Sequence, residues 1–229
     1  TFCCGSWYID LNGNGQFDDP NNHDTDATNG DVVYKFGLPG DYPVVGSWDQ
    51  NGPAAGGTTT DGFDRIGVYG RRAVDAFHSV AGFHFELDLN GNGTLDTDDV
   101  AKGGVFQFGT AGRPVSGHWT GAGAGNDDRV GVFDGKFWYV DINGNHILDA
   151  GETIATNFRG RPIAGDWTGS GVDYVGTFQN NIFYLDMNGD FVFDAADEAL
   201  GGMITFGFSS LGQLPVAADW DADRDSNIG

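Results

Sequence analysis

Four segments of twelve residues are rich in oxygen-bearing side chains, and they begin at Asp10, Asp88, Asp141 and Asp186. Their side-chain oxygens fall at positions 1, 3, 5, 9 and 12, the spacing at which a loop wraps a calcium ion, and position 7 would offer its carbonyl. The predicted ligands are Asp10, Asn12, Asn14, Gln16 and Asp18; Asp88, Asn90, Asn92, Thr94, Asp96 and Asp99; Asp141, Asn143, Asn145, Ile147, Asp149 and Glu152; and Asp186, Asn188, Asp190, Val192, Asp194 and Asp197. We therefore expect three or four structural Ca²⁺ ions.

A plain hairpin turn is the competing interpretation of these segments, because Asn-Gly pairs favour tight turns. Turn chemistry does not explain the oxygens at positions 9 and 12 of the last three copies, whereas the first copy has only Asn21 at position 12. Mg²⁺ is a weaker candidate because it keeps more of its waters. His146 and Phe191 replace the glycine of position 6, which predicts strain there. No helix is predicted beside these loops.

The elements that would position the loops form a repeat of about fifty residues. An aromatic strand precedes each loop, as at 138–140, and a second strand follows it, as at 154–158. A third strand lies between a proline and a tryptophan five residues later. A fourth strand follows a polar loop, as at 174–178. The proline–tryptophan pairs are Pro43 and Trp48, Pro114 and Trp119, Pro162 and Trp167, and Pro215 and Trp220. Their period favours packing between repeats over a sugar-stacking platform.

Four antiparallel strands per repeat predict an all-β fold, a four-bladed β-propeller of four-stranded blades. The single repeat domain 1–229 divides approximately into units 1–69, 70–133, 134–178 and 179–229. The last strand would be completed by residues 1–2, because Ile228-Gly229 followed by Thr1-Phe2 matches 175–178, so the chain termini would close the ring. A segment of a longer tandem array is the alternative, with a β-solenoid or separate β-domains as further options.

Composition limits the partners. The chain has 33 acidic and 11 basic residues among 229, a net charge of −22. Phosphate recognition needs clustered Lys and Arg, so nucleic acid is not an expected partner, whereas cations are. No apolar run is long enough to predict a membrane span. The two cysteines, Cys3 and Cys4, are adjacent, which permits a strained disulfide, two thiols or bonds to another chain.

The run from Phe36 to Trp48, followed by Asp64-Arg65-Ile66-Gly67-Val68-Tyr69, resembles the FG-GAP or VCBS-like propeller repeats of bacteria. The resemblance extends over nearly the whole chain and implies an extracellular, calcium-stabilised propeller, distantly similar to the integrin α head. The family places its calcium loop just after the tryptophan, where only residues 221–225 keep alternating carboxylates and 168–171 have lost them. The four loops that begin at Asp10, Asp88, Asp141 and Asp186 resemble those of EF-hands and dockerins instead.

We expect a secreted or cell-surface calcium-binding module for binding or adhesion, with an unknown protein or glycan ligand. The alternatives are a structural component of a surface layer or filament and, because paired carboxylates hydrolyse glycosides, an extracellular carbohydrate-active enzyme. No nucleophile motif appears, so we predict no enzyme. The insertion between the strands near 69 and 83 carries rare positive charge, and its predicted partner contacts are Arg71, Arg72, Phe77 and His78, with a longer hairpin as the alternative.

Overall fold

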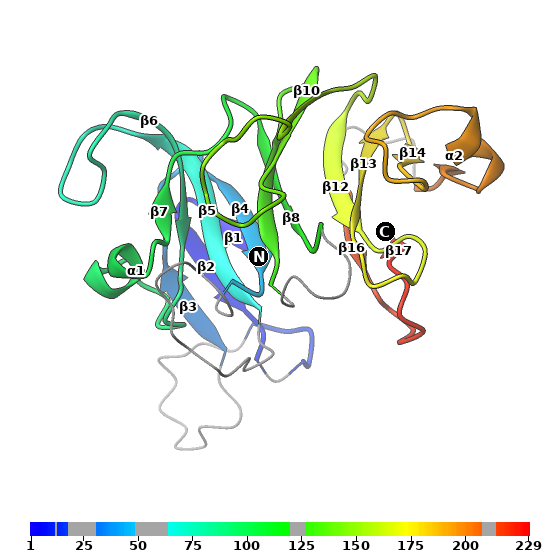
Figure 1. The fold of residues 1–229 in the computed structure, drawn as a ribbon. Coiled ribbons are helices and arrows are strands. Elements are labelled where there is room, and N and C mark those ends of the chain that lie inside the picture. The colour runs from blue at the N-terminus through cyan, green and yellow to red at the C-terminus, as the bar shows by residue number, and fades with distance from the viewer. Residues whose placement is uncertain (12, 18–30, 49–63, 120–126, 208–213) are drawn as a thin grey trace.

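The computed structural model describes residues 1–11, 13–17, 31–48, 64–119, 127–207 and 214–229. Nearly all of the regular structure in these residues is β, in five antiparallel sheets accompanied by two short helices (Figure 1). The predicted all-β class is therefore confirmed. Among the described residues, no helix has the length and apolar character needed to cross a bilayer.

We number the sheets 1 to 5 in chain order, and neighbouring strands in each sheet are also consecutive in the chain. Sheet 1 contains β1 (Phe2–Cys3), β2 (Ser6–Ile9) and β3 (Val32–Lys35); sheet 2 contains β4 (Tyr42–Gly46), β5 (Arg65–Arg72), β6 (Gly82–Leu87) and β7 (Val105–Phe106). Sheet 3 contains β8 (Arg113–Gly117), β9 (Arg129–Phe133), β10 (Phe137–Val140) and β11 (Thr153–Ala155); sheet 4 contains β12 (Arg161–Gly165), β13 (Tyr174–Gln179), β14 (Ile182–Leu185) and β15 (Met203–Thr205); sheet 5 contains β16 (Ala217–Ala218) and β17 (Asn227–Ile228).

The repeated residues have repeated places in the sheets. The proline of each first strand pairs with the second strand at one register, as in Pro43 with Val68 and Pro114 with Val132. These first strands are edge strands, where a missing N–H is tolerated. The glycine that ends β8 leaves room for the ring of Trp119, since a Cβ on Gly117 would lie 2.9 Å from that ring. The predicted proline strands are confirmed, and each four-stranded sheet begins with one. The strand predicted at 154–158 is shorter, since β11 contains only Thr153–Ala155.

The hydrophobic core lies between successive sheets. Val44 and Phe85 of sheet 2 pack with Val130 and Val132 of sheet 3, and Trp138 of sheet 3 belongs to a cluster with Val175 of sheet 4. Similar clusters join sheet 1 to sheet 2 and sheet 4 to sheet 5. Each four-stranded sheet therefore packs against a sheet on either face, as its alternating apolar side chains require.

The first and last strands belong to different sheets. β1 pairs with β2 in sheet 1, and β17 pairs with β16 in sheet 5. The described structure thus contains a row of sheets and does not show the closed ring that the sequence suggested. Cys3 and Cys4 are exposed free thiols, with their sulfur atoms 2.8 Å apart.

The expectation that no helix adjoins the loops is wrong for two of them. α1 (Thr97–Ala101) begins after Asp96, and α2 (Ala195–Ala199) begins after Asp194. Each of these aspartates is an N-cap that forms a capping box with the aspartate three residues later. Such caps satisfy backbone N–H groups that have no partner within the helix, which stabilises even a single turn.

Candidate metal centre

The four predicted loops share one clamp, in which the first carboxylate accepts hydrogen bonds from backbone N–H groups. Asp88 accepts from Gly91 N and Asn92 N at 2.7 and 3.2 Å through Oδ1, and from Gly93 N at 2.8 Å through Oδ2. The same pattern recurs around Asp141 and Asp186. At position 7, the N–H of Gln16, Thr94, Ile147 and Val192 donates to the side-chain oxygen of position 5. The sequence thus specifies a tight, reproducible turn.

Positions 4 and 6 of these loops have a left-handed backbone conformation. Both positions are glycine in the 88–99 loop, where φ is 73° and 72°. His146 and Phe191 occupy position 6 at φ 61° and 65°, so the strain predicted from their side chains is present. Their rings contact the preceding sheet: His146 stacks on Phe106 at 3.8 Å between centroids, and Phe191 packs against the core of sheet 3. Packing therefore offsets the strain.

The carboxylates at positions 9 and 12 have partners of two kinds. Asp96 and Asp149, at position 9, accept hydrogen bonds from the amide groups of the asparagines at positions 3 and 5. The position-12 carboxylates are buried and join the two ends of the loop through backbone N–H groups; Asp99, for example, accepts from Leu89 N at 2.8 Å and Asp96 N at 3.1 Å. These oxygens therefore hold the loop closed in the structure.

Burial and hydrogen bonding shift the pKa values of these groups in opposite directions. Desolvation raises the pKa of Asp186 to about 6 and also raises the pKa values of Asp99 and Asp141. Hydrogen bonds, from Asn92 above all, hold the pKa of Asp96 below its usual range. The buried carboxylates are thus the ones whose charge a bound cation would stabilise most.

Asp31 completes the first loop, and sequence reasoning missed it. Its buried side chain accepts from Leu11 N at 3.1 Å, the role that Asp99 has for Leu89. Asp10 also makes the clamp, with Gly13 N at 2.7 Å and Gly15 N at 2.8 Å. Of the predicted ligands, Asn12 and Asp18 lie outside the described residues, as does Asn21. The sequence signal that was missed is position: Asp31 directly precedes β3, just as the position-12 residue Glu152 directly precedes β11.

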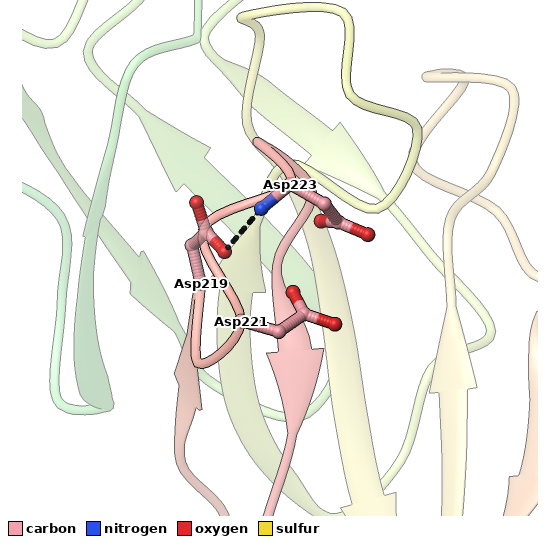
Figure 2. Close-up of side chains that lie close together, drawn as sticks. All are labelled: Asp219, Asp221 and Asp223. Atoms are coloured by element: carbon pink, nitrogen blue, oxygen red, sulfur yellow. Dashed lines mark hydrogen bonds between the residues drawn. The ribbon is translucent and has the colours of Figure 1, made fainter.

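Among the described residues, one set of three acidic side chains could hold a metal ion by itself. Asp219, Asp221 and Asp223 lie in the turn between β16 and β17, and each has an oxygen atom within 4.8 Å of the other two (Figure 2). Asp219 makes the same clamp as the other loops, accepting from Asp223 N at 3.2 Å and Arg224 N at 3.1 Å. The sequence showed the alternation at 221–225, but these aspartates were not chosen as ligands.

The Asp166 loop has this clamp without the acidic side chains. Its carboxylate accepts from Ser170 N at 3.0 Å and Gly171 N at 2.6 Å. Thr168 and Ser170 stand where Asp221 and Asp223 stand in the last loop. The turn therefore forms without paired carboxylates, so the extra acids of 219–223 are not needed for its geometry.

The side chains of Arg72 and His78, which the sequence predicted to contact a partner, are buried within the chain. Arg72 forms ion pairs with Glu86 and Asp41, the latter at 2.6 Å, and His78 Nε2 lies 2.9 Å from Glu86. Burial lowers the pKa of His84, whose ring meets that of His78 edge-on. Arg71 is exposed and Phe77 is half-buried, so these two keep surface area for contacts.

Reciprocal hydrogen bonds link neighbouring sheets at the residues that precede β9 and β13. Asp128 N donates to Ser47 O, while Ser47 N donates to Asp128 Oδ2 at 3.0 Å. Asp173 and His118 repeat the pair at the next junction. Burial raises the pKa of Asp128 to about 6, and it raises that of Asp173 as well.

We expect the contribution of Asp128 to stability to decrease as pH rises. Its pKa is higher in the folded chain than the ordinary value of 3.8, so folding takes up a proton between these values. The contribution is complete below pH 3.8 and is lost as pH passes through about 6, a difference of about 1–3 kcal/mol. Urea unfolding from pH 4 to 8 in chelator should show a shallower fall in stability for Asp128→Asn than for the exposed control Asp98→Asn. Equal slopes for the two variants would contradict this assignment.

Comparison with known proteins gives no family for the chain. No family model, no curated protein and no solved structure matches it.

Proposed function

We propose that this chain is an extracellular calcium-binding module in which calcium is structural. The observation that carries the proposal is the carboxylate group of Asp219, Asp221 and Asp223, because three such oxygens in one turn repel one another without a cation. Support comes from the clamped loops, where the carboxylates of positions 1 and 12 are buried together at Asp88 with Asp99 and at Asp186 with Asp197. Charge buried without a cation is costly, and Ca²⁺ prefers oxygen ligands of this type.

We also propose that the sheets are blades of a β-propeller of the FG-GAP or VCBS-like kind, as the repeated residues suggest. Three four-stranded sheets in series, each packed on the next, are the support for this architecture. Sheets 5 and 1 would supply a fourth four-stranded blade if β17 and β1 formed one continuous strand. Propellers offer broad surfaces for protein or glycan ligands, so a binding or adhesion role is the function we infer, by analogy of fold.

Calcium removal tests the metal assignment. We expect the full chain to bind calcium in elemental analysis and titration calorimetry, and to melt at a lower temperature in chelator. Binding to the folded state alone stabilises by about 2.7 kcal/mol per site when free calcium is 100 times the dissociation constant. An unchanged melting curve and no bound metal would overturn the proposal.

A matched pair of variants distinguishes calcium bound in the 219–223 turn from calcium bound in the twelve-residue loops. Asp221→Asn with Asp223→Asn should remove one bound ion and leave the loops at 88, 141 and 186 loaded. Asp98→Asn with Glu198→Gln removes the same charge from exposed positions and should leave the calcium count unchanged. A full calcium count in the first variant would show that the ions bind only in the other loops.

A structural role in a surface assembly is the second candidate function. The specific observation in its favour is the exposure of the large apolar side chains Phe206, Val216 and Trp220, which lie in the segments beside β15, β16 and β17.

A further inference from the structure

The strands of sheets 2, 3 and 4 run between one end that carries predicted metal loops and one end that carries tight turns. β4, β8 and β12, the first strands of these sheets, lie next to one another (Figure 1). Neighbouring strands are antiparallel, so the turns that precede β6, β10 and β14 lie where the first strands start, which we call the turn end. The loops that begin at Asp88, Asp141 and Asp186 follow these strands and lie at the opposite end.

Basic side chains gather at the turn end. Arg71 near the end of β5, Lys136 in the turn before β10 and Arg159 before β12 are exposed. Arg113 and Arg161, the first residues of β8 and β12, are half-buried. In a chain with a net charge of −22, the turn end is therefore where an anionic ligand meets the least repulsion.

A pocket of about 510 Å³ lies at the turn end, between sheets 2, 3 and 4. Tyr42 and Phe83 line it from sheet 2, and Arg113 and Asp134 line it from sheet 3. Gly160, directly before β12, belongs to its wall, and much of the remaining wall is glycine backbone. Aromatic rings with a few polar groups, in a space of about 300–1,000 Å³, are typical of small-ligand sites. We call this site the Arg113 pocket.

The guanidinium of Arg113 is held in place but not neutralised. Its central carbon lies 5.1 Å from the centroid of the Tyr42 ring, a cation–π contact that orients the side chain. Among the described residues, Arg113 forms no hydrogen bond and no ion pair. The buried Arg72, by contrast, is paired with Asp41 and Glu86. The N–H donors of Arg113 therefore remain available to the oxygen atoms of a ligand.

Arg161 has the same place in the next sheet. Both arginines begin the first strand of their sheet and directly precede its proline. Equivalent positions of neighbouring first strands contact each other, as where Ser116 Oγ donates to Val45 O at 2.6 Å. By the same relation Arg161 neighbours Arg113, directly after the wall residue Gly160. Within the described part of the chain, Arg161 likewise has no hydrogen bond and no ion pair.

We propose that the Arg113 pocket binds an acidic sugar, a uronate unit of an extracellular glycan. Its carboxylate would pair with Arg113 and Arg161, because guanidinium groups match carboxylate oxygens in charge and geometry. Its hydroxyl groups would donate to Asp134, and its apolar C–H face would lie against Tyr42 and Phe83. A sugar acid carries the anion and the hydroxyl donors on one rigid ring, so ordering it costs less than ordering an acidic peptide. A glycan ligand is one form of the binding role proposed above, and this assignment rests on that role.

Two methyl glycosides that differ in a single group test the ligand class. Methyl β-glucuronoside has a carboxylate where methyl β-glucoside has a hydroxymethyl group. In NMR titrations of the full chain at low salt, the glucuronoside should shift the Nε–H signals of Arg113 and Arg161, and the glucoside should not. Equal shifts with both glycosides, or no shift with either, would overturn the proposal. A blocked acidic tripeptide that binds as tightly as the glucuronoside would overturn the choice of a sugar.

Paired substitutions test the two arginines. Arg113→Gln with Arg161→Gln should weaken glucuronoside binding about tenfold or more, because charge-assisted hydrogen bonds are lost. Arg71→Gln with Lys136→Gln removes the same charge from exposed side chains at the turn end and should change binding about twofold or less, since exposed charges are screened. Equal losses in the two double variants would show that the charge of this end, and not the pocket, attracts the glycoside. The titration of the unmodified chain does not depend on any variant being folded.

Calcium counted by elemental analysis in the same samples keeps this proposal separate from the metal assignment. Both double variants should retain the calcium content of the unmodified chain, because the pocket and the predicted metal loops lie at opposite ends of the sheets. A chain that binds calcium but no glucuronoside would overturn the sugar site alone. A chain that binds glucuronoside but no calcium would overturn the metal assignment alone.

Discussion

Replacement of Arg72 by methionine is expected to reduce the free energy of unfolding by about 3–5 kcal/mol. The guanidinium forms two hydrogen bonds with Asp41, at 2.8 and 2.6 Å, and also pairs with Glu86. All three groups are buried, so the methionine would leave two carboxylates without their positive partner. Urea unfolding at constant pH measures the loss.

Arg71→Met is the matched control, because Arg71 is the next residue in β5 and its side chain is exposed. A surface substitution of this kind usually changes stability by about 0.5 kcal/mol or less. If the two variants unfold at the same urea concentration, the buried network does not stabilise the fold as described. Gly70 also restricts this site, because a Cβ there would lie 1.8 Å from Asp41 Oδ1.

Phe158→Ala should also reduce the free energy of unfolding by about 3–5 kcal/mol. Phe158 fills the junction between sheets 3 and 4, where its ring lies 6.2 Å from Trp138 and 6.0 Å from Phe193. Truncation would leave a cavity that rigid sheets cannot close. Thermal and urea unfolding of dilute protein measure the effect.

Phe206→Ala removes the same side chain from the position directly after β15, where the ring is exposed. In a dilute monomer its cost should be about 0.5 kcal/mol or less. The difference between the two variants compares a buried phenylalanine ring with an exposed one. Equal losses would mean that a surface absent from the described structure covers Phe206 in solution.

The fold was predictable from sequence where residues recur at a fixed period. The proline, glycine and tryptophan of each repeat have one structural role apiece, so the strands of the three four-stranded sheets could be placed from the sequence. The arrangement of the ends was not predictable in this way. Whether β17 and β1 share a sheet depends on the geometry accumulated over several junctions, which no local pattern encodes.

The candidate site was predictable in its backbone and less so in its ligands. The Asx-glycine pattern specified the clamp in each loop, and His146 and Phe191 have the strained conformation expected of them. Asp31 was missed because twenty residues separate it from Leu11, the residue it binds. The positive charge of Arg72 suggested a surface contact, but the residues that neutralise it, Asp41 and Glu86, are brought together only by the sheet.

The serial contacts between sheets have a consequence for cooperativity. When each unit touches only its neighbours, the free energy of the array is a sum of unit terms and nearest-neighbour terms, as in a one-dimensional chain of coupled spins. Sheet 3 has two such couplings, through the clusters around Val130 and around Trp138, whereas sheet 5 has one. Sheet 1 likewise has a single coupling, to sheet 2. Fluctuations should therefore fray the array from both ends inwards, and joining the two ends would make both of these sheets interior units.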